Sequence, residues 1–255
     1  RAASAEGEEK DMNGEHTVHA YDDELRQLTD TVLQMGGMVE RQIGDTVAAM
    51  MERDSERLGR IIETDDSIDE FELAVERQVT KMLALRQPMA VDLRSVIGAL
   101  RVASDLERMG DLAKNIAKRG ITLSQAREIP SAWMIPNMAE KVRAMVGQVL
   151  DAYVDQDLEG AERVWRNDQD VDEMYNGLFR QLLTYMMEDA RNITPCTHML
   201  FAAKNLERIG DHATNIAEMI NYRLTGDHRF GDRPKADTTA TFVACAPVEL
   251  DGTLE

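Results

Sequence analysis

Apolar residues recur at intervals of three and four along most of the chain, the spacing that places them on one face of an α-helix. The first such run starts at Asp22, and its stripe comprises Leu25, Leu28, Val32, Met35, Val39, Ile43 and Val47. A second run follows a potential capping residue, Asp54 or Ser55, and its stripe comprises Ile61, Ile68, Phe71, Val75, Val79 and Met82. Because proline lacks an N–H and clashes with the preceding turn, we expect this helix to end before Pro88.

A third helix is predicted from about Met89, with Asp92 in its first turns, where the helix dipole favours a negative charge. Its stripe comprises Val96, Leu100, Ala103, Leu106, Gly110, Ala113 and Ala117. The stretch that follows contains Gly120, Pro130 and Pro136, residues typical of a connection between domains.

The second half of the chain repeats this plan. A fourth helix is indicated by Met138, Val142, Met145, Val149 and Tyr153, and a fifth by Val164, Val171, Met174, Leu178, Leu182 and Tyr185. The fifth stripe matches the second at a constant offset, so the whole unit repeats. A sixth helix is predicted from about Thr194 to Leu224, with Gly226 as its terminating residue. The fold class predicted is therefore all-α, with six long helices in two pseudo-repeated antiparallel three-helix bundles.

This pattern also predicts the organisation of the chain. The first residues are small and charged without helical periodicity, and the last mix Gly, Pro, Thr and Asp, so neither stretch is expected to fold. The expected segments are a disordered arm at 1–20, a first bundle at 21–122, a linker at 123–136, a second bundle at 137–226 and a flexible tail at 227–255.

One motif occurs twice. Residues 105–117 read DLERMGDLAKNIA and residues 205–217 read NLERIGDHATNIA, at an offset of 100, with nine of thirteen positions identical. Each copy carries a Glu, an Asp four residues later and an Asn four beyond that, so each presents a polar ladder headed by two carboxylates. These residues are Glu107, Asp111 and Asn115, and Glu207, Asp211 and Asn215.

Two more carboxylates, Asp65 and Asp69, lie four residues apart on the second predicted helix. Folding this helix back on the third around Pro88 pairs residues whose numbers add up to 176. Asp69 then faces Glu107, and Asp65 faces Asp111. The first bundle is therefore expected to gather four carboxylates in one patch.

The same geometry is expected in the second bundle, where the fifth helix carries Asp168 and Asp172. Folding about the connection at 189–190 pairs residues whose numbers add up to 379. Asp172 then faces Glu207, and Asp168 faces Asp211.

Four carboxylates so close together repel one another unless a cation neutralises them. Oxygen ligands suit Mg²⁺, Ca²⁺, Mn²⁺ or iron, so each patch is a candidate metal site. The alternative is that the carboxylates are solvated faces of acidic helices, paired with basic neighbours such as Arg108, Lys114 or Arg208.

Catalytic signatures are missing. Di-iron sites of the ferritin type need Glu-x-x-His, but neither His198 nor His212 has a Glu three residues earlier. His212, next to Asp211, is interpreted as a surface or partner residue and not a ligand. The sequence contains no phosphate-binding loop, nucleophile elbow or HExxH motif. We therefore expect no enzymatic activity and no organic cofactor.

Composition narrows the possible partners. The formal net charge of −18 argues against nucleic acid and against charge-driven docking on an anionic membrane, and it suits cations or a basic protein partner. The two cysteines form no CxxC pair, which fits a reducing compartment. No apolar run reaches the ~18 residues of a membrane span. A soluble cytoplasmic protein without membrane insertion is expected.

Several longer motifs resemble those of one family. The doubled LERxGDxAxNIA, QPMAVDLR at 87–94, MGGMVERQ at 35–42 and RQLLTYMMEDAR at 180–191 resemble the PhoU family of phosphate-transport accessory regulators, over roughly residues 17–226. The resemblance implies two three-helix bundles, usually in a homodimer. It also implies repression of the phosphate-starvation response and of phosphate uptake, through contacts with the phosphate ABC transporter ATPase and a sensor histidine kinase.

The resemblance further implies metal binding, because some family members hold iron or zinc through an E(D)xxxD motif. That motif falls here on Glu107/Asp111 and Glu207/Asp211, with the acidic pairs of the adjacent helices beside it. Iron, zinc, manganese or magnesium are the candidate ions. Two other interpretations stay open: a carboxylate-bridged metal-binding or storage protein, or metal-dependent enzyme, and a helical scaffold without any ligand.

Overall fold

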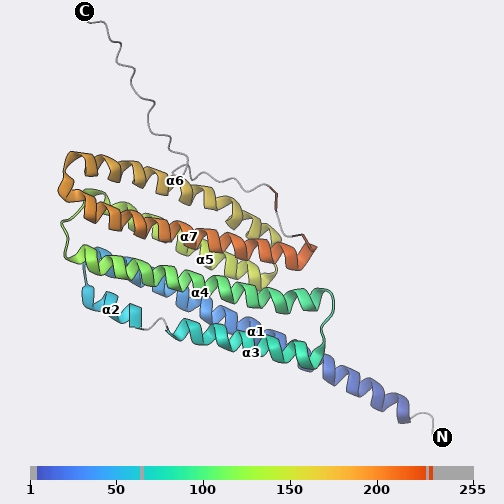
Figure 1. Cartoon of the computed structure of the whole chain (residues 1–255). Coiled ribbons are helices and arrows are strands. Elements are labelled where there is room, and N and C mark those ends of the chain that lie inside the picture. The colour runs from blue at the N-terminus through green and yellow to red at the C-terminus, as the bar shows by residue number, and fades with distance from the viewer. Residues whose placement is uncertain (1–4, 64–65, 228–229, 232–255) are drawn as a thin grey trace, which may run out of the picture.

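The computed structural model describes residues 5–63, 66–227 and 230–231, and over these residues it contains helices and no strands. The elements are α1 (Ala5–Glu52), α2 (Ser55–Glu63), α3 (Asp66–Arg86), α4 (Val91–Ser124), the 3₁₀ turn η1 (Pro130–Trp133), α5 (Met134–Asp155), α6 (Leu158–Glu188), the 3₁₀ turn η2 (Ala190–Asn192) and α7 (Ile193–Thr225). The predicted all-α fold class is confirmed (Figure 1).

The helices run side by side as an elongated stack (Figure 1). α1 to α4 form the first bundle and α5 to α7 the second. α4 and α7 pack against each other at the centre, α1 packs on α5, and α3 and α6 lie on the outer edges. The two predicted three-helix bundles are therefore present, joined along α4 and α7.

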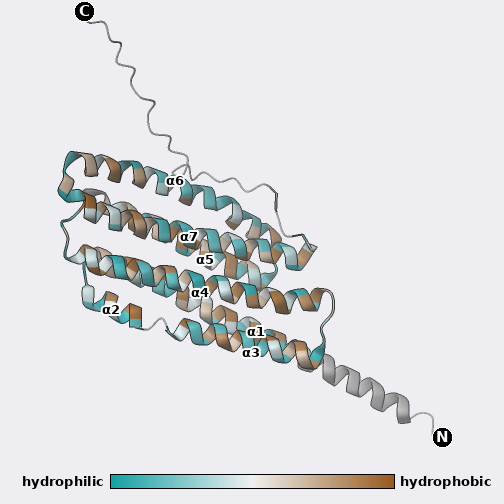
Figure 2. Cartoon of the chain, viewed as in Figure 1, coloured by the Kyte–Doolittle hydropathy of each residue, from teal (hydrophilic) through white to brown (hydrophobic). Residues whose placement is uncertain are grey.

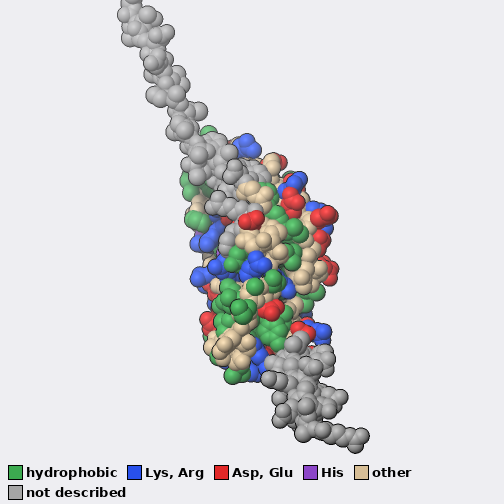
Figure 3. Space-filling model, turned by 90° about the vertical axis from the view of Figure 1, so that its right-hand side faces the viewer, with side chains coloured by type: hydrophobic (Ala, Val, Ile, Leu, Met, Phe, Trp, Pro, Cys, Tyr) green, Lys and Arg blue, Asp and Glu red, His purple; other side chains and the backbone are tan. Residues whose placement is uncertain are grey.

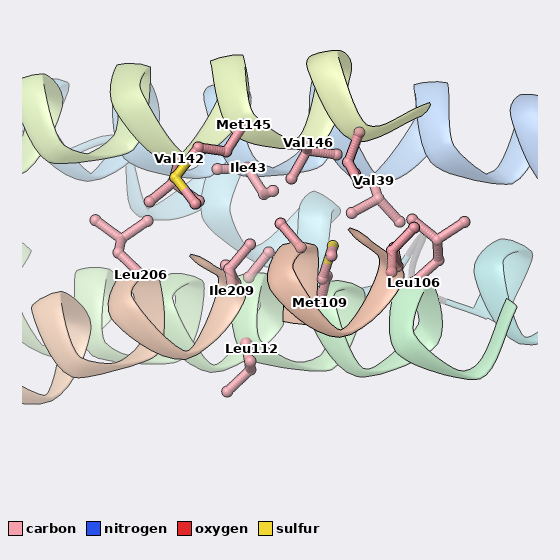
Figure 4. Close-up of a cluster of buried hydrophobic side chains, with 14 of the residues drawn as sticks. Val39, Ile43, Leu106, Met109, Leu112, Val142, Met145, Val146, Leu206 and Ile209 are labelled. Atoms are coloured by element: carbon pink, nitrogen blue, oxygen red, sulfur yellow. The ribbon is translucent and has the colours of Figure 1, made fainter. Parts of the chain in front are cut away.

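Where the bundles meet, they share one hydrophobic core. Teal and brown residues alternate along each helix (Figure 2), as amphipathic packing requires. Figure 4 shows side chains from α1, α4, α5 and α7 meeting in a single cluster, and all of these are buried: Val39, Ile43, Leu106, Met109, Val142, Met145, Val146, Leu206 and Ile209. Truncating one such side chain to alanine costs about 2–5 kcal/mol. The two bundles consequently depend on each other for stability.

Two predicted boundaries differ from the structure. The second predicted helix is divided into α2 and α3, and its first part is capped by Asp54, whose Oδ1 accepts the N–H of Arg57 at 2.9 Å. The division falls in a run of Thr, Asp and Ser, whose side chains compete with the helical backbone for hydrogen bonds. α1 begins at Ala5, inside the stretch expected to be disordered. That stretch is rich in Glu and other helix formers, and extending an existing helix needs no new nucleus.

The remaining helix boundaries lie close to the residues expected to end or begin helices. α4 continues to Ser124 and α5 begins at Met134, so the connection is shorter than the predicted linker of 123–136. Gly226 ends α7 with φ of 90°, as expected for a helix-terminating glycine. The predicted flexible tail lies almost entirely outside the described residues. No helix of the described chain is long and apolar enough to cross a membrane.

The turn between α3 and α4 is strained and apolar. Gln87 and Ala90 flank Pro88 and Met89 with φ of 49° and 52°, a region that L-residues rarely adopt. The positive φ at Ala90 explains why α4 starts at Val91 and not at Met89. Met89 is 80% exposed. Figure 3 looks onto this end of the molecule and shows hydrophobic side chains gathered there.

Candidate metal-binding carboxylate sets

The second-bundle set comprises Asp168 and Asp172 on α6 and Glu207 and Asp211 on α7. Asp168, Asp172 and Glu207 are 2%, 3% and 4% exposed, and Asp211 is half-buried. α6 comes close to α7 where Gly210 lacks a side chain: a Cβ there would lie 3.2 Å from Asp168 Oδ1. The predicted antiparallel packing therefore brings these four carboxylates to the same part of the helix pair.

Glu207 is the most perturbed of the four. Burial, helped by the neighbouring charges of Asp211 and Asp172, raises the pKa of its carboxyl to about 7, against the Lys204 ammonium that donates to Oε1 at 2.7 Å. Its other oxygen, Oε2, is buried and accepts no hydrogen bond within the described chain. A buried carboxylate oxygen of this kind is suited to a bound cation.

The first-bundle set is more open to solvent. Asp69 is exposed, Asp111 is half-buried, and the side chain of Glu107 is 18% exposed. Burial raises the pKa of Glu107, and the charges of Asp111, Glu72 and Asp69 add to this effect while Arg108 opposes it. Asp69, Glu107 and Asp111 are thus neighbours, as predicted. The fourth predicted member, Asp65, lies outside the described residues.

Sequence reasoning missed one carboxylate of the first-bundle set. Glu72 lies three residues after Asp69 on α3, a spacing that puts both on one helix face. Burial raises its pKa, and the charges of Glu76 and Asp69 do the same, against the opposing effects of Ser104 and Arg108. The i,i+3 spacing could have revealed it. The repeat concealed it, because the equivalent position on α6 is Tyr175, which lies under the Lys204 ammonium at 5.1 Å.

The residue types of the two sets suit a metal ion, but their side chains are not arranged around one. Their donors are carboxylate oxygens, which suit hard and borderline cations. Over the described part of the chain, no three Asp, Glu, His or Cys side chains are already arranged to hold an ion. Binding would need the carboxylates to turn toward one another. Glu207, with its buried Oε2, is the best placed to do so in the second-bundle set.

His212 does not belong to either set. Its Nδ1 lies 2.8 Å from Asp105 Oδ1 on α4, so it joins the two bundles and not the two helices of the second bundle. The sequence predicts a surface or partner residue here, and the structure places His212 half-buried at the contact between the two bundles. His198 lies on the same side of α7, with Nδ1 3.5 Å from the Arg119 guanidinium.

Comparison with known proteins agrees with the division of the chain into two related helical bundles. The PhoU domain model matches residues 32–120 and 135–220, one copy in each bundle. The phosphate-specific transport system accessory protein PhoU homolog of Caulobacter vibrioides is 49% identical over 224 residues, covering 88% of this chain and 97% of the relative. The homolog of Rhizobium meliloti is 46% identical over 232 residues, covering 90% and 98%.

Solved structures of PhoU proteins share this fold. The crystal structure of PhoU from Pseudomonas aeruginosa is 39% identical and aligns with a TM-score of 0.78, over 81% of this chain and 99% of that one. The phosphate transport system regulatory protein PhoU from Streptococcus pneumoniae is 30% identical with a TM-score of 0.76, over 82% and 99%. Two domain matches in tandem, close relatives and the shared fold together show that the chain belongs to the PhoU family.

Proposed function

We propose that this protein is a non-catalytic regulator of phosphate homeostasis. In this role it represses the phosphate-starvation response and phosphate uptake, as an adaptor between the ATPase of the phosphate ABC transporter and a sensor histidine kinase. The observation that carries the proposal is family membership over nearly the full length of relatives described as accessory proteins of the phosphate-specific transport system. The sequence shows no catalytic motif that would favour an enzyme.

The surface supports a protein that contacts others. Large apolar side chains are exposed at the α3–α4 turn, where Leu85, Met89 and Val91 are 65%, 80% and 53% exposed. At the opposite end, near the α6–α7 turn, Met187 and Ile193 are 87% and 49% exposed. Clustered apolar exposure is typical of protein contacts, and two separate clusters suit an adaptor with two partners. We also infer a cytoplasmic homodimer, which light scattering of the purified protein would test.

The regulatory proposal is tested by deleting the gene and measuring a phosphate-starvation reporter in high phosphate. We expect the reporter to switch on, and a plasmid copy of the wild-type gene to restore repression. Met89→Glu and Met187→Glu should each weaken complementation and capture of one partner, whereas Arg166→Ala on the exposed face of α6 should not. A deletion strain that still represses the reporter would refute the proposal.

A second candidate function, metal binding or storage, is favoured by the buried second-bundle set. Under this proposal, Asp168, Asp172, Glu207 and Asp211 hold one cation and Asp69, Glu107 and Asp111, with Asp65, hold another. A bound ion would neutralise the carboxylates and fix α3 to α4 and α6 to α7. Elemental analysis of the purified protein should find metal in the wild type and less in the Asp168→Asn/Asp172→Asn variant. Equal metal content in both proteins would contradict the assignment.

A further inference from the structure

The contact between α4 and α7 has an internal two-fold symmetry. Asp105 meets His212, and Arg119 meets His198. In both contacts the residue numbers add up to 317, so the helices are antiparallel. We call the contact between α4 and α7 the seam. Because the repeats are offset by 100 residues, the two-fold axis relates each residue on α4 to the residue on α7 whose number is higher by 100. Arg108 and Arg208 lie near the symmetry axis.

One half of the seam is hollow. A cavity of about 490 Å³ opens between the two helices, lined by Arg101, Ser104, Asp105, Arg108, His212, Asn215, Glu218 and Met219. Cavities of this size accommodate small-molecule ligands.

The counterpart half of the seam is lined by different side chains. Phe201 stands at the position equivalent to Arg101, and the guanidinium of Arg119 stacks on its ring at 4.8 Å. Leu112 takes the place of His212. The repeat therefore supplies an internal comparison: equivalent backbone positions carry Phe201 and Leu112 on one side and polar groups around a cavity on the other.

The cavity is lined by two basic and two acidic side chains, and the excess of basic residues along the seam comes from its other half. The eight lining positions and their eight counterparts include six basic residues and two acidic ones, in a chain whose formal net charge is −18. The basic residues are Arg101, Arg108, Lys118, Arg119, Lys204 and Arg208, and the acidic ones are Asp105 and Glu218. Inside the cavity the two Arg and the two carboxylates balance formally, so its attraction for an anion depends on which of these charges already have partners.

Inside the cavity, the acidic groups already have donors. Asp105 Oδ1 faces His212 Nδ1 at 2.8 Å and accepts from Asn215 Nδ2 at 3.2 Å. Glu218 accepts from the indole N–H of Trp165 at 3.3 Å. In contrast, Arg101 forms no ion pair with any described residue. Arg108 lies 3.5 Å from Glu107 and its charge also acts on Glu72 of α3, but its side chain is 65% exposed.

We propose that the seam cavity binds a small oxyanion of the phosphate class, either free phosphate or the terminal phosphate of a small metabolite. Arg101 and Arg108 lie seven residues apart on α4, a rise of about 10 Å, so their long side chains can close on one anion from two directions. Guanidinium groups bind phosphate oxygens through paired hydrogen bonds. His212 and Asn215 add polar groups from α7. This inference depends on the charges of the cavity and not on the regulatory function proposed above.

The test is equilibrium binding by calorimetry at constant ionic strength, with inorganic phosphate and glycerol 3-phosphate as separate probes. We expect the wild type to bind at least one of them, and the stronger probe distinguishes a free from an esterified ligand. Arg101→Ala/Arg108→Ala should weaken binding by about tenfold or more, because the paired hydrogen bonds of both guanidinium groups are lost. The matched control Arg60→Ala/Arg166→Ala removes the same charge elsewhere and should change affinity by less than about twofold.

Two further variants separate a specific site from general charge attraction. Arg101→Lys/Arg108→Lys keeps the charge but loses the paired hydrogen bonds, so its affinity should fall between those of the wild type and the double alanine variant. Arg101→Phe copies the side chain of the counterpart half and should abolish binding while the circular dichroism spectrum stays helical. The proposal is overturned if the wild type binds neither probe at about 1 mM, or if the matched control loses as much affinity as the double alanine variant.

Discussion

In the second bundle, Asp168 and Asp172 are 2% and 3% exposed and the side chain of Glu207 is 6% exposed; in the first bundle, Asp69 is exposed and the side chain of Glu107 is 18% exposed. The two sets come from the same repeated motif on equivalent helix pairs. One set lies in the protein interior and the other lies nearer the surface. The motif alone therefore does not decide how its carboxylates behave.

The packing around each set explains the difference. In the second bundle α6 comes close to α7 at Gly210, and Lys204 covers Glu207 while lying over Tyr175. In the first bundle the equivalent of Tyr175 is Glu72, a further acidic side chain that favours contact with water. Burial strengthens every electrostatic interaction, so the second-bundle set should respond more strongly to protons and to cations.

The largest contrast should be in the pH dependence of stability. The folded-state pKa of Glu207 is about 7, above its ordinary value of 4.5, so the folded protein keeps this proton to higher pH than the unfolded chain does. The resulting stabilisation is complete below the unfolded pKa and is lost as pH rises through about 7, a loss of about 3 kcal/mol. Urea denaturation of metal-free protein between about pH 5 and pH 8 should show this fall, and Glu207→Gln should remove most of it.

Glu107→Gln is the matched change in the first bundle. Its pKa is raised in the same direction by burial and by neighbouring carboxylates, but the side chain is more exposed. The effect on the pH dependence should therefore be smaller than that of Glu207→Gln. Equal effects would mean that the difference in burial has no energetic consequence.

A smaller contrast is expected for metal ions, under the metal-binding proposal. Saturation at about one hundred times the dissociation constant stabilises a protein by about 2.7 kcal/mol. Asp172→Asn should remove most of the Mn²⁺-dependent rise in the thermal midpoint, and Asp69→Asn should remove less, because water screens the exposed set. Asp170→Asn, an exposed change on α6, serves as the control. If Asp69→Asn removed more of the Mn²⁺-dependent rise than Asp172→Asn, the exposed set would be the stronger metal site and the prediction would be wrong.

The smallest contrast concerns two equivalent glycines. Exchanging a mid-helix Gly for Ala gains up to about 1 kcal/mol of helix propensity. A Cβ at Gly110 would lie 3.0 Å from the end of the Ile68 side chain, which can move, whereas a Cβ at Gly210 would lie 3.2 Å from Asp168 Oδ1. Gly110→Ala should be neutral within about 1 kcal/mol, and Gly210→Ala should be the less stable variant by chemical denaturation. The opposite order would show that Asp168 moves freely.

Much of this architecture could be predicted from residue spacing. The periodicity identified the helices, Pro88 and Gly226 marked two ends, and the duplicated motif predicted which helices face each other. Asp172 of α6 acts on Glu207 of α7 as the antiparallel pairing requires. These features depend on local sequence and on one connection, both of which can be read directly.

The burial of each set and the seam between the bundles could not be predicted in this way. Both depend on how the two halves pack together, and Asp105 and His212, which meet across 107 residues, carry no local signal of their contact. The interruption between α2 and α3 also escaped the pattern, because the apolar stripe continues through it from Ile61 to Ile68. Periodicity describes a helix face and does not specify its partner.

The core shared by α1, α4, α5 and α7 has a consequence for synthesis on the ribosome (Figure 4). When the first bundle has been made, the inner faces carrying Val39 and Leu106 have no partner until α5 and α7 emerge. The repeat offset of 100 residues corresponds to a delay of about 5–20 s at 5–20 residues per second. During that interval the nascent chain exposes an apolar surface that favours aggregation. Packing of the second repeat then buries this surface.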